Sequence, residues 1–116
     1  MGFNFVIWRG EIYNIELGNP VGHEPAWQRP CVVVSNDSLN QSPGNLVAVV
    51  PITSTRYGLR SHVAIEASSS GLDHDSYARC DQVRTVSANR FGTLQGFAPV
   101  DAMAQIATAL RYILDL

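Results

Sequence analysis

Arginine and hydroxyl side chains stand at the ends of two apolar segments of this sequence. Arg29 directly precedes the run PCVVVS, and Thr53, Ser54 and Thr55 follow the run LVAVVPI. Arginine is always charged and is rarely buried without a partner, so Arg29 is either a rim residue or a side chain aimed at a ligand. The guanidinium fork suits phosphate, whereas hydroxyls at a strand end either bind phosphate oxygens or cap a turn.

A second polar group lies within the run CDQVRT, which contains Asp81, Gln82 and Arg84. If this run is a continuous strand, alternation places Gln82 and Arg84 on one face. Polar side chains on one face of a strand either line a groove or face water.

Histidines and cysteines give no sign of a metal site. His23, His62 and His74 are scattered, and neither an HExxH nor a CxxC spacing occurs. A lone histidine in a loop is more often a surface group than a catalyst. Cys31 and Cys80 lie in apolar runs, which indicates buried thiols in a reducing compartment. The sequence predicts neither a metal nor another cofactor.

The composition indicates one compact domain. The chain has 116 residues, of which 46% are hydrophobic and 16% charged, and its net charge is -2. Bulk charge therefore does not indicate a nucleic-acid binder. All eight cationic residues are arginine, which fits phosphate recognition or simply a GC-rich genome. No secretory or transmembrane segment is recognisable, so we expect a soluble, cytoplasmic protein.

The pattern of apolar residues predicts a mainly β fold. Strands are predicted at 10–17, 31–35, 46–53, 62–66, 76–86 and 92–97. Residues 68–75 read as a loop, and Pro51 suggests an edge or a bulge. Short helical turns are expected near residues 36–44 and after Ser87, and an amphipathic helix is expected from an N-cap at Asp101 to the C-terminus. Many short strands with one terminal helix favour a small, strongly curved β-barrel.

Taken in order, the segments resemble the MazF/PemK toxins of bacterial toxin–antitoxin systems. The resemblance rests on RGEIYNIEL, GHEPAWQRPCVVVSND, VAVVPITS, RSHVAIE and DSYARCDQVRT, followed by a C-terminal helix ending in ILDL. No single motif is specific, but the ordered set is, and it extends from about Arg9 over the rest of the chain.

The resemblance implies an SH3-like barrel that forms a homodimer. It also implies metal-independent, sequence-specific cleavage of single-stranded RNA, which leaves 2′,3′-cyclic phosphate and 5′-hydroxyl ends. The implied protein partner is a small MazE-like antitoxin. The alternative is a non-enzymatic binder such as the CcdB toxins, which share this fold and act on DNA gyrase.

Carried over by motif, the resemblance makes Arg29 and Thr53 the catalytic residues. It implies RNA contacts for Ser76 and Gln82, and it matches Glu24 to an acidic loop position whose role is the least defined. Trp27, Asp81 and Arg84 are further candidates for RNA contacts in this sequence. Trp27 belongs to a stiff PAW segment where the family is often glycine-rich. This tryptophan either stacks on a base, packs against the antitoxin or the partner subunit, or covers the barrel mouth.

Overall fold

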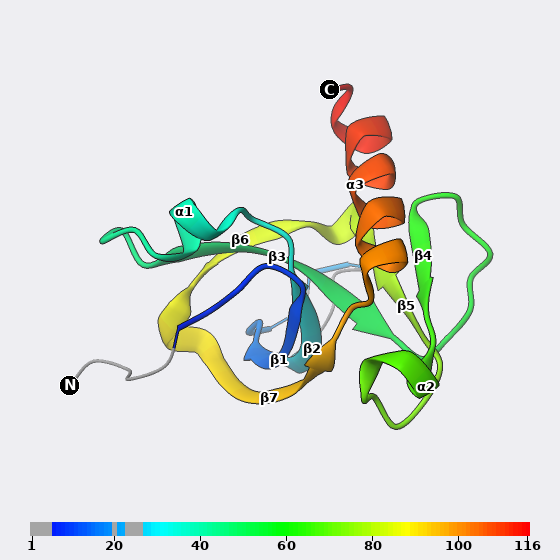
Figure 1. The fold of residues 1–116 in the computed structure, drawn as a ribbon, viewed down its shortest axis with the longest axis horizontal. Coiled ribbons are helices and arrows are strands. Elements are labelled where there is room, and N and C mark those ends of the chain that lie inside the picture. The colour runs from blue at the N-terminus through cyan, green and yellow to red at the C-terminus, as the bar shows by residue number, and fades with distance from the viewer. Residues whose placement is uncertain (1–5, 20, 23–26) are drawn as a thin grey trace.

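The computed structural model describes residues 6–19, 21–22 and 27–116. Within them, seven strands form one curved antiparallel sheet in the order β4-β5-β3-β2-β1-β7, with β6 also paired to β3 (Figure 1). The strands are β1 (Glu11–Glu16), β2 (Gln28–Val33), β3 (Leu46–Thr53), β4 (His62–Ile65), β5 (Ser76–Arg79), β6 (Arg84–Ser87) and β7 (Phe91–Phe97).

Three α-helices and two 3₁₀ turns complete the described chain. They are α1 (Asp37–Asn40), α2 (Ala67–Ser70), α3 (Val100–Leu114), η1 (Cys80–Gln82) and η2 (Ala88–Arg90). The predicted class, mainly β with a C-terminal helix, is confirmed. The predicted barrel is an open, strongly curved sheet, because no ladder joins β4 to β7 within the described residues.

β3 is the central strand, and it changes partner along its length. One edge pairs with β2, while the other pairs with β6 over Leu46–Val49 and then with β5 over Ile52–Thr53. The amide and carbonyl of Ala48 both bond toward β2, so alternation points the backbone of Pro51 toward the opposite edge. Pro51 lies where that edge changes partner, so its missing N–H interrupts no ladder. It marks neither a sheet edge nor a bulge.

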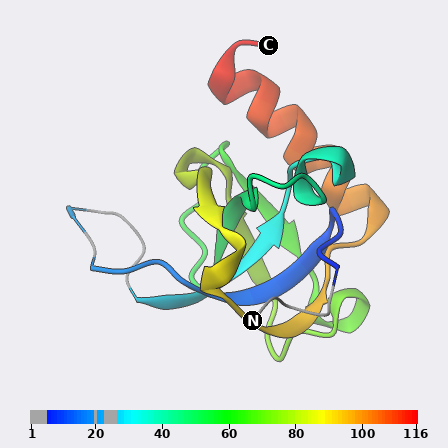
Figure 2. The ribbon, with the colours of Figure 1, turned by 90° about the vertical axis from the view of Figure 1, so that its left-hand side faces the viewer.

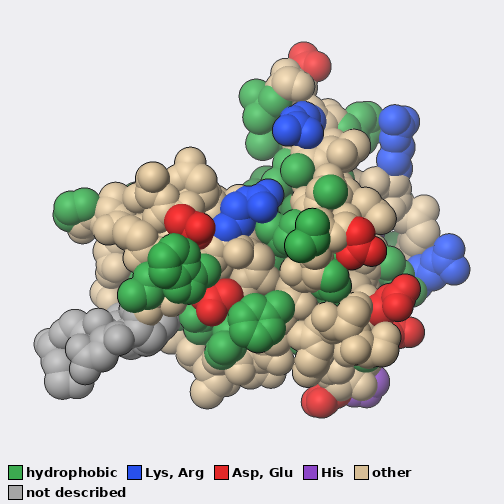
Figure 3. Space-filling view, in the orientation of Figure 1, with side chains coloured by type: hydrophobic (Ala, Val, Ile, Leu, Met, Phe, Trp, Pro, Cys, Tyr) green, Lys and Arg blue, Asp and Glu red, His purple; other side chains and the backbone are tan. Residues whose placement is uncertain are grey.

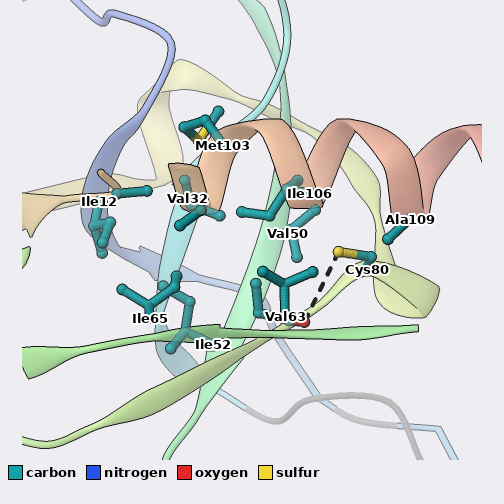
Figure 4. Close-up of a cluster of buried hydrophobic side chains, with 13 residues drawn as sticks. Ile12, Val32, Val50, Ile52, Val63, Ile65, Cys80, Met103, Ile106 and Ala109 are labelled. Carbon is teal, nitrogen blue, oxygen red and sulfur yellow. Dashed lines mark hydrogen bonds between the residues drawn. The ribbon is translucent and has the colours of Figure 1, made fainter. Parts of the chain in front are cut away.

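Apolar residues cover both faces of the central strands. In β1, Tyr13 and Ile15 are buried on one face, whereas on the other Ile12 is buried and Asn14 and Glu16 are partly exposed. One cluster fills the space between the sheet and α3, where Met103, Ile106 and Ala109 point toward the strands (Figure 4). The other fills the curve of the sheet. The double burial explains why the chain is continuously apolar over residues 30–34 in and after β2 and over residues 46–52 in β3.

α3 begins one residue before the predicted cap. Pro99 is its N-cap, and Asp101 lies in the first turn, where its carboxylate accepts a bond from the Ala102 amide at 2.9 Å. A carboxylate in that turn complements the positive end of the helix dipole. Ile106 is fully buried, as its spacing predicts, but Leu114 is 52% exposed. No helix among the described residues is long and apolar enough to span a membrane.

The predicted strand 76–86 is broken. β5 ends at Arg79, the 3₁₀ turn η1 follows, and β6 begins at Arg84. The break lets the chain move from one part of β3 to another while Cys80 stays buried. The predicted loop 68–75 also begins within a short helix, α2, which ends at Gly71 with a left-handed φ of 83°.

Candidate functional site

Arg29 lies inside a strand. β2 begins at Gln28, before the apolar run, because residues 28–30 pair with β1; there, Arg29 stands opposite Ile15. Its side chain is exposed. Among the described residues, none forms a hydrogen bond or ion pair with its guanidinium. The strand therefore holds the backbone of Arg29 firmly while its charged fork remains available to a ligand.

Thr53 is the last residue of β3, the strand that pairs with β2. The last β2–β3 pair is Cys31 with Pro51, and Arg29 and Thr53 each lie two residues beyond it. The Oγ1 atom of Thr53 accepts a hydrogen bond from the amide of Thr55 at 3.1 Å. Because a hydroxyl accepts and donates at once, this bond orients the group and leaves its O–H to donate.

Arg29 and Thr53 line one pocket of about 210 Å³. Its walls come from β2, the end of β3, the loop after α2, the start of β5, and β7. The lining residues are Arg29, Pro30, Ile52, Thr53, Ser54, Leu72, Asp73, His74, Ser76 and Gln95. Pockets for whole small molecules usually measure about 300–1,000 Å³. This one suits a single phosphodiester group, with flanking groups held outside it.

Ser76 is brought to the pocket, but its hydroxyl is already engaged. Ser76 is only 7% exposed, and its Oγ donates to the backbone carbonyl of His74 at 2.9 Å. The carboxylate of Asp75 accepts from the amide of Ala67 at 2.8 Å. These two bonds tether the loop that presents Asp73 and His74. The Ser76 hydroxyl thus holds the wall of the pocket in place. Because its proton is engaged, its oxygen can only accept a hydrogen bond from a ligand.

Asp73, His74 and Gln95 line the pocket without having been predicted as site residues. In the sequence, His74 is a lone histidine in a loop, and no local pattern indicates that β7 lies near the end of β3. The available signal was the position of His74 two residues before Ser76, which the family resemblance had already singled out.

Asp81, Gln82 and Arg84 do not line this pocket. The carboxylate of Asp81 meets Nε2 of His62 at 3.3 Å. The broken strand also removes the predicted shared face of Gln82 and Arg84, because Gln82 ends the η1 turn.

Arg84 belongs to another stretch of the same sheet. It pairs with Val49, four residues from Thr53, which is about 13 Å along a strand. One Nη of Arg84 donates to the carbonyl of Leu17 at 3.4 Å. Arg84 therefore lies toward the base of the β1–β2 hairpin.

Trp27 stands at the base of that hairpin, which extends from the body of the protein in Figure 2. Its amide donates to Gly18 at 2.8 Å, and its carbonyl accepts from Leu17 at 2.7 Å. The residue has a left-handed φ of 55°, and its side chain is 60% exposed. Such an exposed ring fits contact with RNA, an antitoxin or a second subunit better than a place over the barrel mouth. Glu24 lies outside the described residues.

The two thiols are not nucleophiles. Cys31 and Cys80 are fully buried, and burial raises the pKa of each to about 12. The charge of Arg84 lowers the pKa of Cys31, but by less than burial raises it. Within the described part of the chain, no cluster of three or more His, Cys, Asp or Glu is placed to hold a metal ion.

Larger hollows lie elsewhere. One of about 390 Å³ runs between α3 and the start of β4, and one of about 360 Å³ is lined by Arg56, Tyr57 and Tyr77, among others. Neither includes Arg29 or Thr53. On the face in Figure 3, cationic side chains are scattered without a continuous basic stripe. The chemistry of the lining, not its volume, distinguishes the Arg29–Thr53 pocket.

Comparisons with known proteins agree with this fold. Residues 8–114 match the family described as the PemK-like, MazF-like toxin of type II toxin–antitoxin systems. The chain belongs to this family.

Two curated relatives are similar over nearly their whole length. Endoribonuclease MazF9 of Mycobacterium tuberculosis is 35% identical over 113 residues, which cover 93% of this chain and 96% of that protein. Endoribonuclease EndoA of Bacillus subtilis is 30% identical over 112 residues, covering 96% and 97% of the two chains.

A solved structure of a mycobacterial endoribonuclease in complex with its cognate antitoxin has the same fold. It superposes with a TM-score of 0.79 at 27% identity, over 96% of this chain and 97% of that one.

Proposed function

We propose that this chain is a metal-independent endoribonuclease toxin that cleaves single-stranded RNA at a phosphodiester held between Arg29 and Thr53. The main support is that Arg29 and Thr53, from adjacent strands, line one pocket of phosphodiester size. The family match and the named activity of the relatives support RNA as the substrate.

RNA supplies its own nucleophile, so the enzyme needs neither a metal nor a covalent intermediate. The 2′-oxygen attacks phosphorus, the 2′-O–P bond forms, and the P–O5′ bond breaks. Charge develops on the non-bridging oxygens of the pentacoordinate phosphorane. The Arg29 fork can hold two of these oxygens, and the oriented hydroxyl of Thr53 can donate to one. The products carry a 2′,3′-cyclic phosphate and a 5′-hydroxyl.

RNA outside the pocket would follow the same face of the sheet. Arg84 lies about 13 Å along β3 from Thr53, on the side of the hairpin base where Trp27 is exposed. Asp81 and Gln82 lie on the η1 turn, just before Arg84 in the chain, and are secondary candidates for RNA contacts. Glu24 stays a candidate from the resemblance alone.

We further propose a homodimer, cytoplasmic action and inhibition by a small MazE-like antitoxin. The structural neighbour bound to its cognate antitoxin supports this last partner. The exposed Trp27 offers an antitoxin an aromatic anchor at the hairpin base.

The proposed activity is tested by incubating the purified protein with a long RNA in the presence of EDTA and mapping the new 5′-hydroxyl ends. Cleavage at a recurrent short sequence is expected. An absence of cut RNA, together with inhibition of DNA gyrase in a supercoiling assay, would favour the CcdB-like binder instead.

A further inference from the structure

The proposed cleavage moves two protons, and Arg29 and Thr53 do not provide for both. The 2′-hydroxyl must lose a proton as its oxygen attacks, and the departing O5′ must gain one. A guanidinium stays protonated at neutral pH, so it can donate a proton but is a poor acceptor. Thr53 already accepts the Thr55 amide and offers only its O–H. The pocket therefore needs a separate base.

Two side chains of the pocket can accept a proton, and both belong to the loop between α2 and β5: Asp73 and His74. A general base works best when its pKa lies near the working pH. Imidazole is the side chain that satisfies this condition without perturbation, whereas an ordinary carboxylate is far too weak a base. Among the described residues, His74 is the only imidazole that lines this pocket; His62 lies against Asp81 and lines other hollows.

We propose that His74 is the general base of the cleavage step. Its neutral imidazole takes the proton of the 2′-hydroxyl as the 2′-O–P bond forms. As the P–O5′ bond breaks, the departing O5′ takes a proton from the Arg29 guanidinium, which regains one from solvent. This assignment rests on the proposed nuclease function and adds to it a residue outside the predicted catalytic pair.

The loop is built to hold His74 in place. The backbone carbonyl of His74 is bound by the buried Ser76 hydroxyl at 2.9 Å, and the Asp75 carboxylate is tied to the Ala67 amide at 2.8 Å. The charged groups that line the pocket beside the imidazole are Arg29 from β2 and Asp73 from the same loop. The Asp75 carboxylate is occupied by its tether. A tethered backbone with an exposed side chain is the arrangement that a proton-transfer group requires.

The test is the pH dependence of single-turnover cleavage by the wild type, His74→Gln, His74→Ala and Asp73→Asn. A base must be unprotonated, so the wild-type rate should fall on the acidic side of neutrality. His74→Gln should lower the rate at neutral pH by about 10²-fold or more and remove this acidic limb. Added imidazole should restore part of the His74→Ala rate. Asp73→Asn, from the same loop, should keep the limb.

Binding is measured separately with an RNA that cannot be cleaved because it carries a 2′-deoxynucleotide at the mapped cut site. His74→Gln should bind this RNA as tightly as the wild type does. The assignment is overturned if His74→Gln keeps both rate and limb, if its loss is only in RNA affinity, if imidazole gives no rescue, or if Asp73→Asn removes the limb. A wild type that cleaves no RNA would instead overturn the proposed function itself.

Discussion

Arg29 and Thr53 lie on the adjacent strands β2 and β3, each two residues beyond Cys31 and Pro51, the last pair of that ladder. Both residues line one pocket at this end of the two strands. The guanidinium is unpartnered among the described residues, whereas the Thr53 hydroxyl is oriented by the amide of Thr55. The Arg29 guanidinium and the Thr53 hydroxyl thus line the same pocket, and substitutions can test the role of each separately.

Replacing Arg29 tests the fork and the charge independently. Arg29→Ala should lower the rate of cleavage by about 10²–10³-fold, because it removes stabilisation of the phosphorane. Arg29→Lys keeps the charge but loses the bidentate geometry, so it should also be strongly impaired. Single-turnover rates measure both changes, and unchanged melting temperatures verify the fold, since the side chain is exposed. A lysine variant as fast as the wild type would show that charge alone suffices.

Thr53 should contribute through its hydroxyl. Thr53→Val keeps the volume but removes the donor to the phosphate and the acceptor of the Thr55 amide. The rate should fall by about 10²-fold. Thr53→Ser retains the hydroxyl and serves as the matched control, with most of the activity expected to remain. Equal rates for the valine and serine variants would contradict a role for the hydroxyl.

Trp27 should report RNA binding directly. The chain has two tryptophans, so Trp8→Phe leaves Trp27 as the sole fluorophore. Stacking on a base should quench its emission, and Trp27→Ala should weaken affinity for RNA by about 1–3 kcal/mol. The measurement is a titration with non-cleavable 2′-deoxy-substituted RNA. If RNA does not quench the emission and Trp27→Ala binds RNA as tightly as the wild type, the exposed ring serves a protein partner. A titration of the same fluorescence with an antitoxin, or a dimerisation assay of Trp27→Ala, would then identify that partner.

Much of this fold was predictable because β-branched runs and helical spacing are local signals. The run at 46–53 is a strand with the expected bounds, and Ser87 caps the η2 turn through the amide of Asn89. The break at Cys80–Gln82 was not predicted, because these residues include no glycine or proline to signal a turn. That break follows from β3 exchanging β5 for β6, which is a tertiary requirement.

The site shows the same division. Arg29 and Thr53 were identified by resemblance, and the β2–β3 register accounts for their proximity. His74 and Gln95 reach the pocket only because a loop and a distant strand fold back to the end of β3. Single-sequence patterns do not encode such long-range approaches. They also suggest free polar groups, such as the Ser76 hydroxyl, that the folded chain has already engaged.

Gly96 should be intolerant of a side chain. It is buried in β7, and a Cβ added there would overlap the backbone carbonyl oxygen of Ser70 at the end of α2. Gly96→Ala should therefore lower the free energy of unfolding by about 1–3 kcal/mol. Gly44→Ala is the control, because its nearest neighbour is a side-chain atom at 3.9 Å. Urea unfolding of the two variants makes the comparison, and equal stability would show that the α2–β7 contact is looser than described.

The buried thiols should make the fold sensitive to alkali. Burial raises the pKa of Cys31 and Cys80 from 9.0 to about 12, so the folded state favours the neutral thiols. Their contribution to stability is complete below pH 9 and is lost as the pH rises toward 12. Tyr13, whose pKa is raised to about 12 by burial and by Glu11, adds to this loss.

Urea unfolding at several alkaline pH values measures this decline, and a thiol reagent at neutral pH provides the control. Both cysteines should be unreactive in the native protein and react fully once it is unfolded. Rapid labelling of the native protein would contradict the burial that underlies the prediction.

In the proposed reaction, the Arg29–Thr53 pocket positions the 2′-hydroxyl of RNA for attack on the adjacent phosphorus. The most direct measurement uses a short RNA containing the mapped cut site, with and without a single 2′-deoxynucleotide on the 5′ side of the scissile bond, in the presence of EDTA. The all-RNA strand should be cut to a 2′,3′-cyclic phosphate and a 5′-hydroxyl, while the substituted strand should bind but stay intact. Cleavage of the substituted strand at the same bond would contradict the proposed reaction.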